Sequence, residues 1–113
     1  MAAYCKRLGD GFAWQSIDGE RCPYARLDGH HDVEVSGYVT HVNDGLDCVN
    51  VFLWHVPDFG RPDVAERLTG VMYVPNDPDT VRSVCDGLRE HLAEAHEMGR
   101  TEVTWPRWQE LGW

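Results

Sequence analysis

A strand-like segment followed by a tight turn constrains the fold of this chain more than any other feature of its sequence. Between residues 31 and 42, apolar and polar side chains alternate, which is the period of a strand with one buried face. Asp44-Gly45 then suits a short turn, and residues 47–56 return as a second, apolar-rich strand. The sequence therefore predicts an antiparallel hairpin.

The alternation also predicts how the two strands of this hairpin face each other. We place Val35 opposite Trp54, which puts Glu34 opposite His55. The core face then holds Val33, Val35, Phe52 and Trp54. The outer face combines acidic and apolar side chains, namely Asp32, Glu34, Tyr38, Asp47 and Leu53.

Other strands are predicted on either side of this hairpin. Residues 12–17 and 20–27 flank the turn dipeptide Asp18-Gly19 and form an N-terminal hairpin. Pro23 lacks an N–H donor, so we expect its strand at a sheet edge. Residues 64–74 predict a third strand of a meander, with a bulge at Gly70.

A long helix is predicted in the C-terminal half. Asp77 suits its N-cap, Pro78 its first position and Gly99 its end. The apolar stripe repeats at helical spacing: Val81, Val84, Cys85, Leu88, Leu92 and Ala95. We therefore expect one α+β domain over residues 1–113, with a curled antiparallel sheet (N-terminal hairpin plus three-strand meander) packed on one long helix.

The charge of the chain narrows the partners that it can have. The formal net charge is −9, and no lysine or arginine lies between Leu27 and Gly60. That stretch holds six carboxylates and four of the six histidines. Nucleic acid and anionic membranes attract basic side chains, so neither is expected as a direct partner. An acidic, ordered surface instead suits a basic protein.

The sequence gives no sign of a membrane segment or an exported protein. No apolar run approaches the roughly 20 residues that cross a bilayer, and Lys6, Arg7 and Asp10 interrupt the N-terminal stretch where a secretory signal has its apolar core. A cytoplasmic location is expected. The four cysteines form no CxxC pair, and we expect them to be reduced.

Two groups of side chains raise the alternatives of a metal site or an enzyme. His41 faces Cys48 in the predicted register, and Cys85 on the helix stripe could join them around zinc. No ligand-spacing motif accompanies them, so no cofactor is expected and zinc stays the alternative. Glu34 beside His55 could orient a general base, but no nucleophile motif is present. The enzyme hypothesis is therefore the weaker one.

Adjacent His30 and His31, followed by Asp32, resemble a metal-binding group. Neighbouring strand residues point to opposite faces, so a regular strand cannot direct both histidines to one ion. This motif alone predicts no metal site.

The function that we expect is protein binding by a small acidic inhibitor, which masks the cationic surface of a nuclease or nucleic-acid-binding protein. Immunity proteins and phage counter-defence inhibitors work in this way, and they serve only as an analogy of class. The expected partner-binding residues are Asp32, Glu34, Tyr38, Asp47, Leu53 and His55, with Trp105 and Trp108 as further anchors. These two tryptophans could instead fasten the C-terminal tail to the domain.

Two other functions stay open at this point. One is a small metal- or ligand-binding domain, or an enzyme, that uses His41, Cys48 and Cys85. The other is a homodimer formed through the exposed hairpin face.

Overall fold

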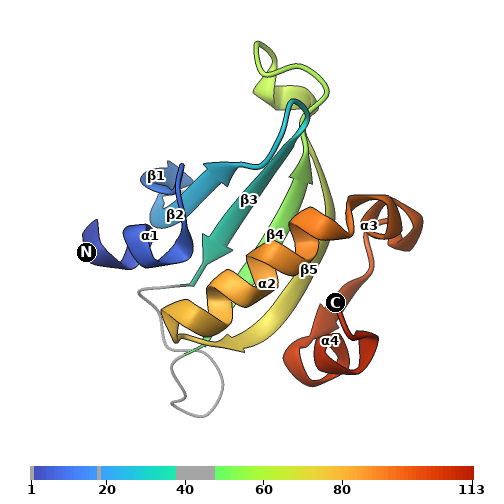
Figure 1. Ribbon diagram of the computed structural model, residues 1–113. Coiled ribbons are helices and arrows are strands. Elements are labelled where there is room, and N and C mark those ends of the chain that lie inside the picture. Colours follow the sequence, from blue (N-terminus) through green and yellow to red (C-terminus); the bar gives the residue numbers. More distant parts are fainter. Residues whose placement is uncertain (1, 18, 38–47) are drawn as a thin grey trace.

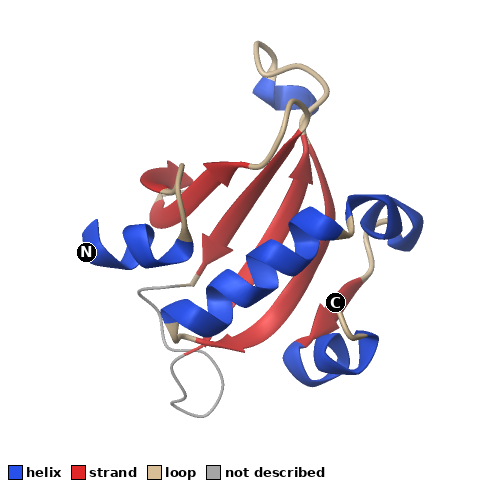
Figure 2. Ribbon diagram, viewed as in Figure 1, coloured by secondary structure: helices blue, strands red, loops and turns tan. Residues whose placement is uncertain are grey.

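The computed structural model describes residues 2–17, 19–37 and 48–113, and it has the α+β class that the sequence predicts. Figure 1 labels the elements and Figure 2 colours them by type. In chain order they are α1 (Ala2–Leu8), β1 (Ala13–Ile17), β2 (Glu20–Arg26), β3 (His31–Ser36), β4 (Cys48–His55), the 3-10 helix η1 (Pro62–Val64), β5 (Glu66–Pro75), α2 (Pro78–Glu90), α3 (Leu92–Met98), β6 (Glu102–Thr104) and α4 (Trp105–Leu111).

Within the described residues, the strands form one sheet in sequence order from β1 to β6. Strands β1 to β5 are antiparallel neighbours, so the pairings of the N-terminal hairpin and of the meander are present. Strand β6 joins β5 in parallel. The sheet is therefore mixed, whereas the sequence predicted a wholly antiparallel one. The direction of β6 depends on where α2 and α3 return the chain, and the local sequence does not encode that path.

The single long helix expected up to Gly99 is two helices, which corrects the prediction. Helix α2 begins as predicted, because the Asp77 side chain caps it by accepting a hydrogen bond from the Thr80 N–H. It ends where His91 leaves the helical region, with φ −120° and ψ 38°. The His91 ring stacks on Trp113, with ring centroids 4.9 Å apart. This contact involves the end of the chain, so the spacing of the apolar stripe could not reveal the break.

The register of β3 against β4 differs from the predicted one by three residues. Val35 lies opposite Val51 rather than Trp54. Because side chains alternate between the two faces of a strand, an odd shift exchanges the faces of one strand. Leu53 therefore faces the core, and Trp54 faces away from it.

The observed register gathers the aliphatic side chains on one face. Both registers pair apolar residues across the hairpin, so the strand sequences alone do not choose between them. In the structure, four fully buried side chains share the face toward the core: Val33, Val35, Val51 and Leu53.

Two local predictions about strands are also wrong. Strand β2 lies inside the sheet, although Pro23 predicted an edge. The β2–β3 pairing covers only Tyr24 to Arg26, so the missing N–H of Pro23 removes no hydrogen bond to β3. Gly70 pairs regularly with Phe52 instead of forming a bulge. The Phe52 ring fills the space beside it, 2.6 Å from where a Cβ at Gly70 would stand.

The helices and the sheet form two layers. Helix α2 crosses in front of the sheet in Figure 1, and its buried residues Val81, Val84, Cys85 and Leu88 join the core. We call the sheet face toward α2, which carries Val33, Val35 and Leu53, the helix side. The other face, which carries Asp32, Glu34 and Trp54, is the open side. In the part of the chain that the structure describes, no helix combines the length and apolar character needed to cross a membrane.

Candidate functional site

The open side contains a pocket of about 360 Å³. Its walls come from strands β1 to β4 and from the segment between β4 and β5. The polar lining is Gln15, Tyr24, Arg26, Asp32 and Glu34, and the apolar and aromatic lining is Ile17, Trp54, Val56, Phe59 and Ala65. Every second residue of a strand faces the same side, which is why residues two apart line the pocket together.

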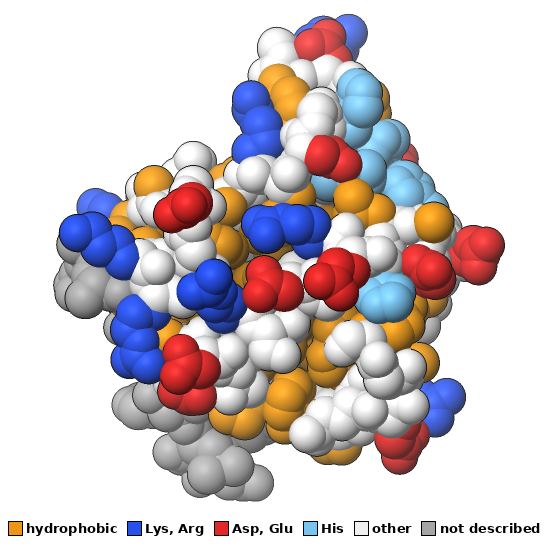
Figure 3. Space-filling view, in the orientation of Figure 1, with side chains coloured by type: hydrophobic (Ala, Val, Ile, Leu, Met, Phe, Trp, Pro, Cys, Tyr) orange, Lys and Arg blue, Asp and Glu red, His pale blue; other side chains and the backbone are white. Residues whose placement is uncertain are grey.

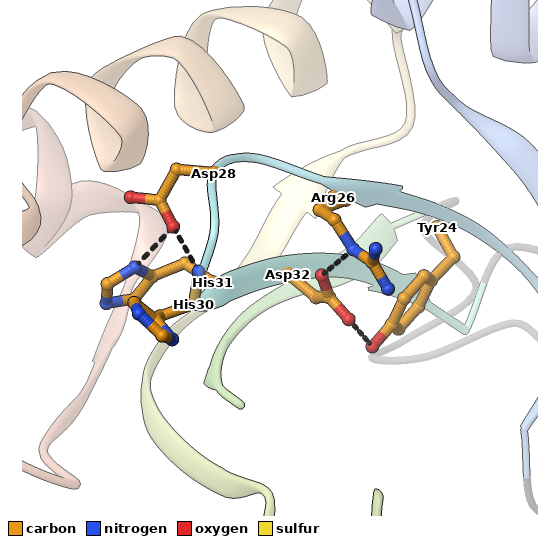
Figure 4. A network of polar contacts seen from close by, with 6 residues as sticks. All are labelled: Tyr24, Arg26, Asp28, His30, His31 and Asp32. Atoms are coloured by element: carbon orange, nitrogen blue, oxygen red, sulfur yellow. Dashed lines mark hydrogen bonds and ion pairs between the residues drawn. The ribbon is translucent and has the colours of Figure 1, made fainter. Parts of the chain in front are cut away.

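Asp32 places a buried charge in the pocket wall, since its side chain is only 6% exposed. The Tyr24 hydroxyl donates a 2.5 Å hydrogen bond to Oδ2, and Arg26 Nε lies 3.8 Å from Oδ1 (Figure 4). The Arg26 contact is an ion pair too long for a hydrogen bond, so Oδ1 has no hydrogen-bond partner among the described residues. A buried oxygen without a donor costs free energy, and a cationic group that brought its own N–H donors would offset this cost.

Glu34 is the second buried carboxylate of the pocket, and the residue is 5% exposed. The Trp54 Nε1–H donates a 2.9 Å hydrogen bond to Oε1 of Glu34. Arg67 stands beside Trp54, with its guanidinium carbon 5.4 Å from the centre of that ring and 4.0 Å from the centre of the Phe52 ring. Arg67 also forms a 2.9 Å ion pair with Glu102. The indole therefore fixes the position of Glu34 within a ring-lined wall.

Arg26 lies at the mouth of the pocket. Its guanidinium carbon is 3.4 Å from the centre of the Phe59 ring, and its side chain is 60% exposed. An exposed cation–π contact of this kind contributes only about 0.5–1 kcal/mol. Arg26 is thus a weakly held cation next to Asp32.

The surroundings of Tyr24 fix its protonation state. Burial raises the pKa of the Tyr24 hydroxyl, and the hydrogen bond to Asp32 and the charges of Asp32 and Glu34 raise it further, against a smaller lowering by Arg26. The hydroxyl therefore stays protonated near neutral pH and donates to Asp32. It is neither a base nor a nucleophile in this state.

A second group of titratable side chains lies at the start of β3 on the helix side. His31 Nδ1 is 2.8 Å from Asp28 Oδ1, and His31 Nε2 is 2.8 Å from Nε2 of His96 on α3. The His55 ring centroid is 5.4 Å from that of His31 and 5.3 Å from that of His96. We call His31, His55 and His96 the histidine cluster. Figure 3 shows histidine side chains next to one another at this edge of the molecule.

The histidine cluster and the pocket lie on opposite sides of β3, and Figure 4 shows the contacts between Asp28 and His31 apart from those of Asp32 with Tyr24 and Arg26. Burial lowers the pKa of His55, and the neighbouring histidines lower it further, whereas Glu66 raises it. His55 is therefore neutral at pH 7.

The structure divides the residues that the sequence predicted as one binding face. Asp32 and Glu34 stay together in the pocket, but they are buried rather than exposed. His55 does not pair with Glu34, because the corrected register puts it opposite His31 on the helix side. Leu53 has no exposed surface, so it cannot contact a partner.

The two C-terminal tryptophans pack against the domain. Trp108 is 4% exposed and belongs to the core. It is therefore not the surface anchor that the sequence suggested. Trp105 is half-buried against the same core. Tyr38 and Asp47 lie outside the described residues, and their roles stay predictions.

The predicted zinc ligands are only partly described. Cys85 is fully buried and Cys48 is 7% exposed, whereas His41 lies outside the described residues. Over residues 2–17, 19–37 and 48–113, no group of three or more His, Cys, Asp or Glu side chains has an arrangement that could hold a metal ion. A site that includes His41 stays a prediction.

The sequence predicts strand β2, but not the two pocket residues that it contributes. Tyr24 and Arg26 are two residues apart in β2, and this spacing alone indicates that they share a face. Their partners are set by the β2–β3 pairing, which puts Tyr24 opposite Glu34 and Arg26 opposite Asp32. No local pattern in β2 specifies that pairing.

A scan against protein-family models, a search of curated proteins and a search of solved structures each found no match for this chain. We therefore infer the kind of ligand from the chemistry of the side chains that line the pocket. Buried carboxylates in a pocket with aromatic walls bind cationic groups through charge-assisted hydrogen bonds and cation–π contacts.

Proposed function

We propose that this chain binds a basic protein through its open side, and that an arginine or lysine side chain of the partner enters the pocket beside Asp32. The observation that carries this proposal is the Oδ1 atom of Asp32, which is buried and has no hydrogen-bond partner among the described residues. A guanidinium or ammonium group supplies the N–H donors that this atom lacks, and its positive charge strengthens those hydrogen bonds.

The walls of the pocket support the same kind of ligand. Trp54, Tyr24 and Phe59 offer ring faces, and a cation held against a desolvated ring gains about 2 kcal/mol. The pocket volume of about 360 Å³ lies at the small end of the range for binding pockets, which suits one side chain rather than a large cofactor. Arg26 already forms a cation–π contact with Phe59, though at the exposed mouth of the pocket rather than against a desolvated ring.

The charge of the whole chain supports a basic partner. A net charge of −9 attracts a cationic protein over long distances and speeds its association, and salt weakens this attraction. Covering a cationic surface would block a nuclease or a nucleic-acid-binding protein, because such proteins use that surface for phosphates. We therefore extend the proposal to an inhibitor of the immunity-protein or phage counter-defence kind.

The test compares three forms of the protein as baits for capture from a cell lysate. They are the wild type, Asp32→Asn/Glu34→Gln, and the control Glu90→Gln/Glu97→Gln. Both double variants remove two negative charges, but Glu90 and Glu97 are exposed on α2 and α3, away from the pocket. Circular dichroism checks that all three forms fold.

We expect the wild type and the control to retain a basic protein, and the pocket variant to retain at least about ten-fold less of it, as expected for the loss of hydrogen bonds to a charged group. Equal capture by all three forms would put the interface elsewhere. Equal loss in both double variants would mean that net charge alone drives binding.

A further inference from the structure

The histidine cluster brings together three imidazoles that are far apart in the sequence. They come from the start of β3, the end of β4 and helix α3, so they meet only in the folded chain. The three ring centroids lie 5.1, 5.3 and 5.4 Å from one another. His96 is exposed, so the cluster is open to ions in solution.

Asp28 determines which nitrogen of His31 faces this cluster. Its Oδ1 accepts a 2.8 Å hydrogen bond from Nδ1 of His31, so the neutral ring carries its proton on Nδ1. The Nε2 atom then presents a lone pair, and Nε2 of His96 lies 2.8 Å away. A carboxylate behind the imidazole is the usual way in which proteins orient a metal-ligating histidine.

We propose that His31 and His96 bind a divalent transition-metal ion, such as zinc or nickel, through their Nε2 atoms, with His55 as third ligand. Imidazole nitrogen is a preferred ligand of both ions. A proton on His96 Nε2 and a metal ion compete for the same two nitrogen atoms, because either one satisfies both. When the ion binds, neutral His96 carries its proton on Nδ1 instead.

Binding requires a small movement. Nitrogen ligands 2.0–2.1 Å from a tetrahedral ion lie about 3.3 Å apart, so the present 2.8 Å separation has to widen by about half an ångström. His96 is an exposed residue of the seven-residue helix α3, and His55 is half-buried at the end of β4. No three ligands are already in place among the described residues, so His55 has to turn toward the pair as the ion binds.

This proposal is independent of the proposed function. The histidine cluster lies on the helix side of β3, and the pocket lies on the open side. Failure of one proposal therefore leaves the other untouched.

The test is calorimetric titration of the untagged full chain with zinc chloride, repeated with nickel chloride. The variant is His96→Ala, and the matched control is His91→Ala, which removes the same kind of side chain where it stacks on Trp113. We expect the wild type and the control to bind one ion per chain with micromolar affinity. His96→Ala should bind at least about ten-fold more weakly, and Asp28→Asn about ten- to a hundred-fold more weakly, because Asp28 orients His31.

Two results would overturn the proposal. One is the absence of binding heat with either metal, or the same affinity in His96→Ala as in the wild type. The other concerns the free cysteines: if Cys48→Ser loses the ion while His96→Ala keeps it, the ion belongs to the predicted group of His41, Cys48 and Cys85. Circular dichroism on each variant separates loss of the site from loss of the fold.

Discussion

The two sides of β3 hold ionisable groups in different settings. On the helix side, both ring nitrogens of His31 are hydrogen-bonded, to Asp28 and to His96. On the open side, the next residue, Asp32, keeps one buried carboxylate oxygen without a hydrogen-bond partner among the described residues. The strand pleat directs these neighbouring side chains to opposite faces. His31 therefore meets His96 of helix α3, whereas Asp32 faces the pocket.

This difference indicates which kind of ligand each side of β3 can bind. Imidazole nitrogens that face one another can act together as ligands of a transition-metal ion. A fixed, buried negative charge has affinity for a cation that brings its own donors. The two sides therefore predict two different chemistries from adjacent residues.

The variants with the largest expected effect on stability test which residues of β4 face the helix side and which face the open side. Leu53→Ala should lower the free energy of unfolding by about 2–5 kcal/mol, because Leu53 is fully buried on the helix side. Trp54→Phe, one residue further, should lower it by about 1–3 kcal/mol, since the ring body stays and the hydrogen bond to Glu34 is lost. Urea unfolding measures both, and the reverse order would contradict the observed register.

Tyr24→Phe tests the hydrogen bond that holds Asp32. We expect a loss of about 1.5–3 kcal/mol in the free energy of unfolding at pH 8, because the buried carboxylate loses its hydroxyl donor.

The same variant should change the dependence of stability on pH. The pKa of Tyr24 is raised above its unfolded value of about 10, so its contribution is present below that pH and is lost as the pH rises above it. Stability of the wild type should thus fall more steeply between pH 9 and pH 11 than that of Tyr24→Phe. Parallel curves from urea unfolding would show that Tyr24 is not buried against Asp32.

Gly70→Ala tests the packing of the open side at β5. A Cβ there would lie 2.6 Å from the Phe52 ring, so we expect a loss of about 1–3 kcal/mol from overpacking. Gly29→Ala is the control, because a Cβ at Gly29 meets no atom within 4 Å. Thermal unfolding that is equal for both variants would mean that the Phe52 ring does not cover Gly70.

Arg26→Ala should have the smallest effect on stability and a useful effect on binding. The Arg26 side chain is exposed, so we expect less than about 1 kcal/mol of change in the free energy of unfolding. Because Arg26 competes with a partner's cation for Asp32, its removal should tighten partner binding. Weaker binding in this variant would make Arg26 part of the interface rather than a competitor.

Local signals in the sequence predicted part of this fold. Asp77 and Pro78 marked the start of α2, because capping depends on neighbouring residues only. Alternation located β3 and β4, but it did not fix their register, since valines can pair in either one. The partners of Tyr24 and the approach of His96 to His31 depend on residues far apart in the chain. Asp32 and Glu34 were therefore identified without the pocket that surrounds them.

The most direct test of the central claim is an NMR titration that follows the indole N–H of Trp54, which donates to Glu34 inside the pocket. The ligands are N-acetyl-arginine amide and its uncharged counterpart N-acetyl-citrulline amide. We predict a saturable shift of this resonance with the arginine compound in the wild type, and no such shift with the citrulline compound or in Asp32→Asn. The same shift in Asp32→Asn, or no shift with the arginine compound, would contradict a pocket that receives a basic side chain.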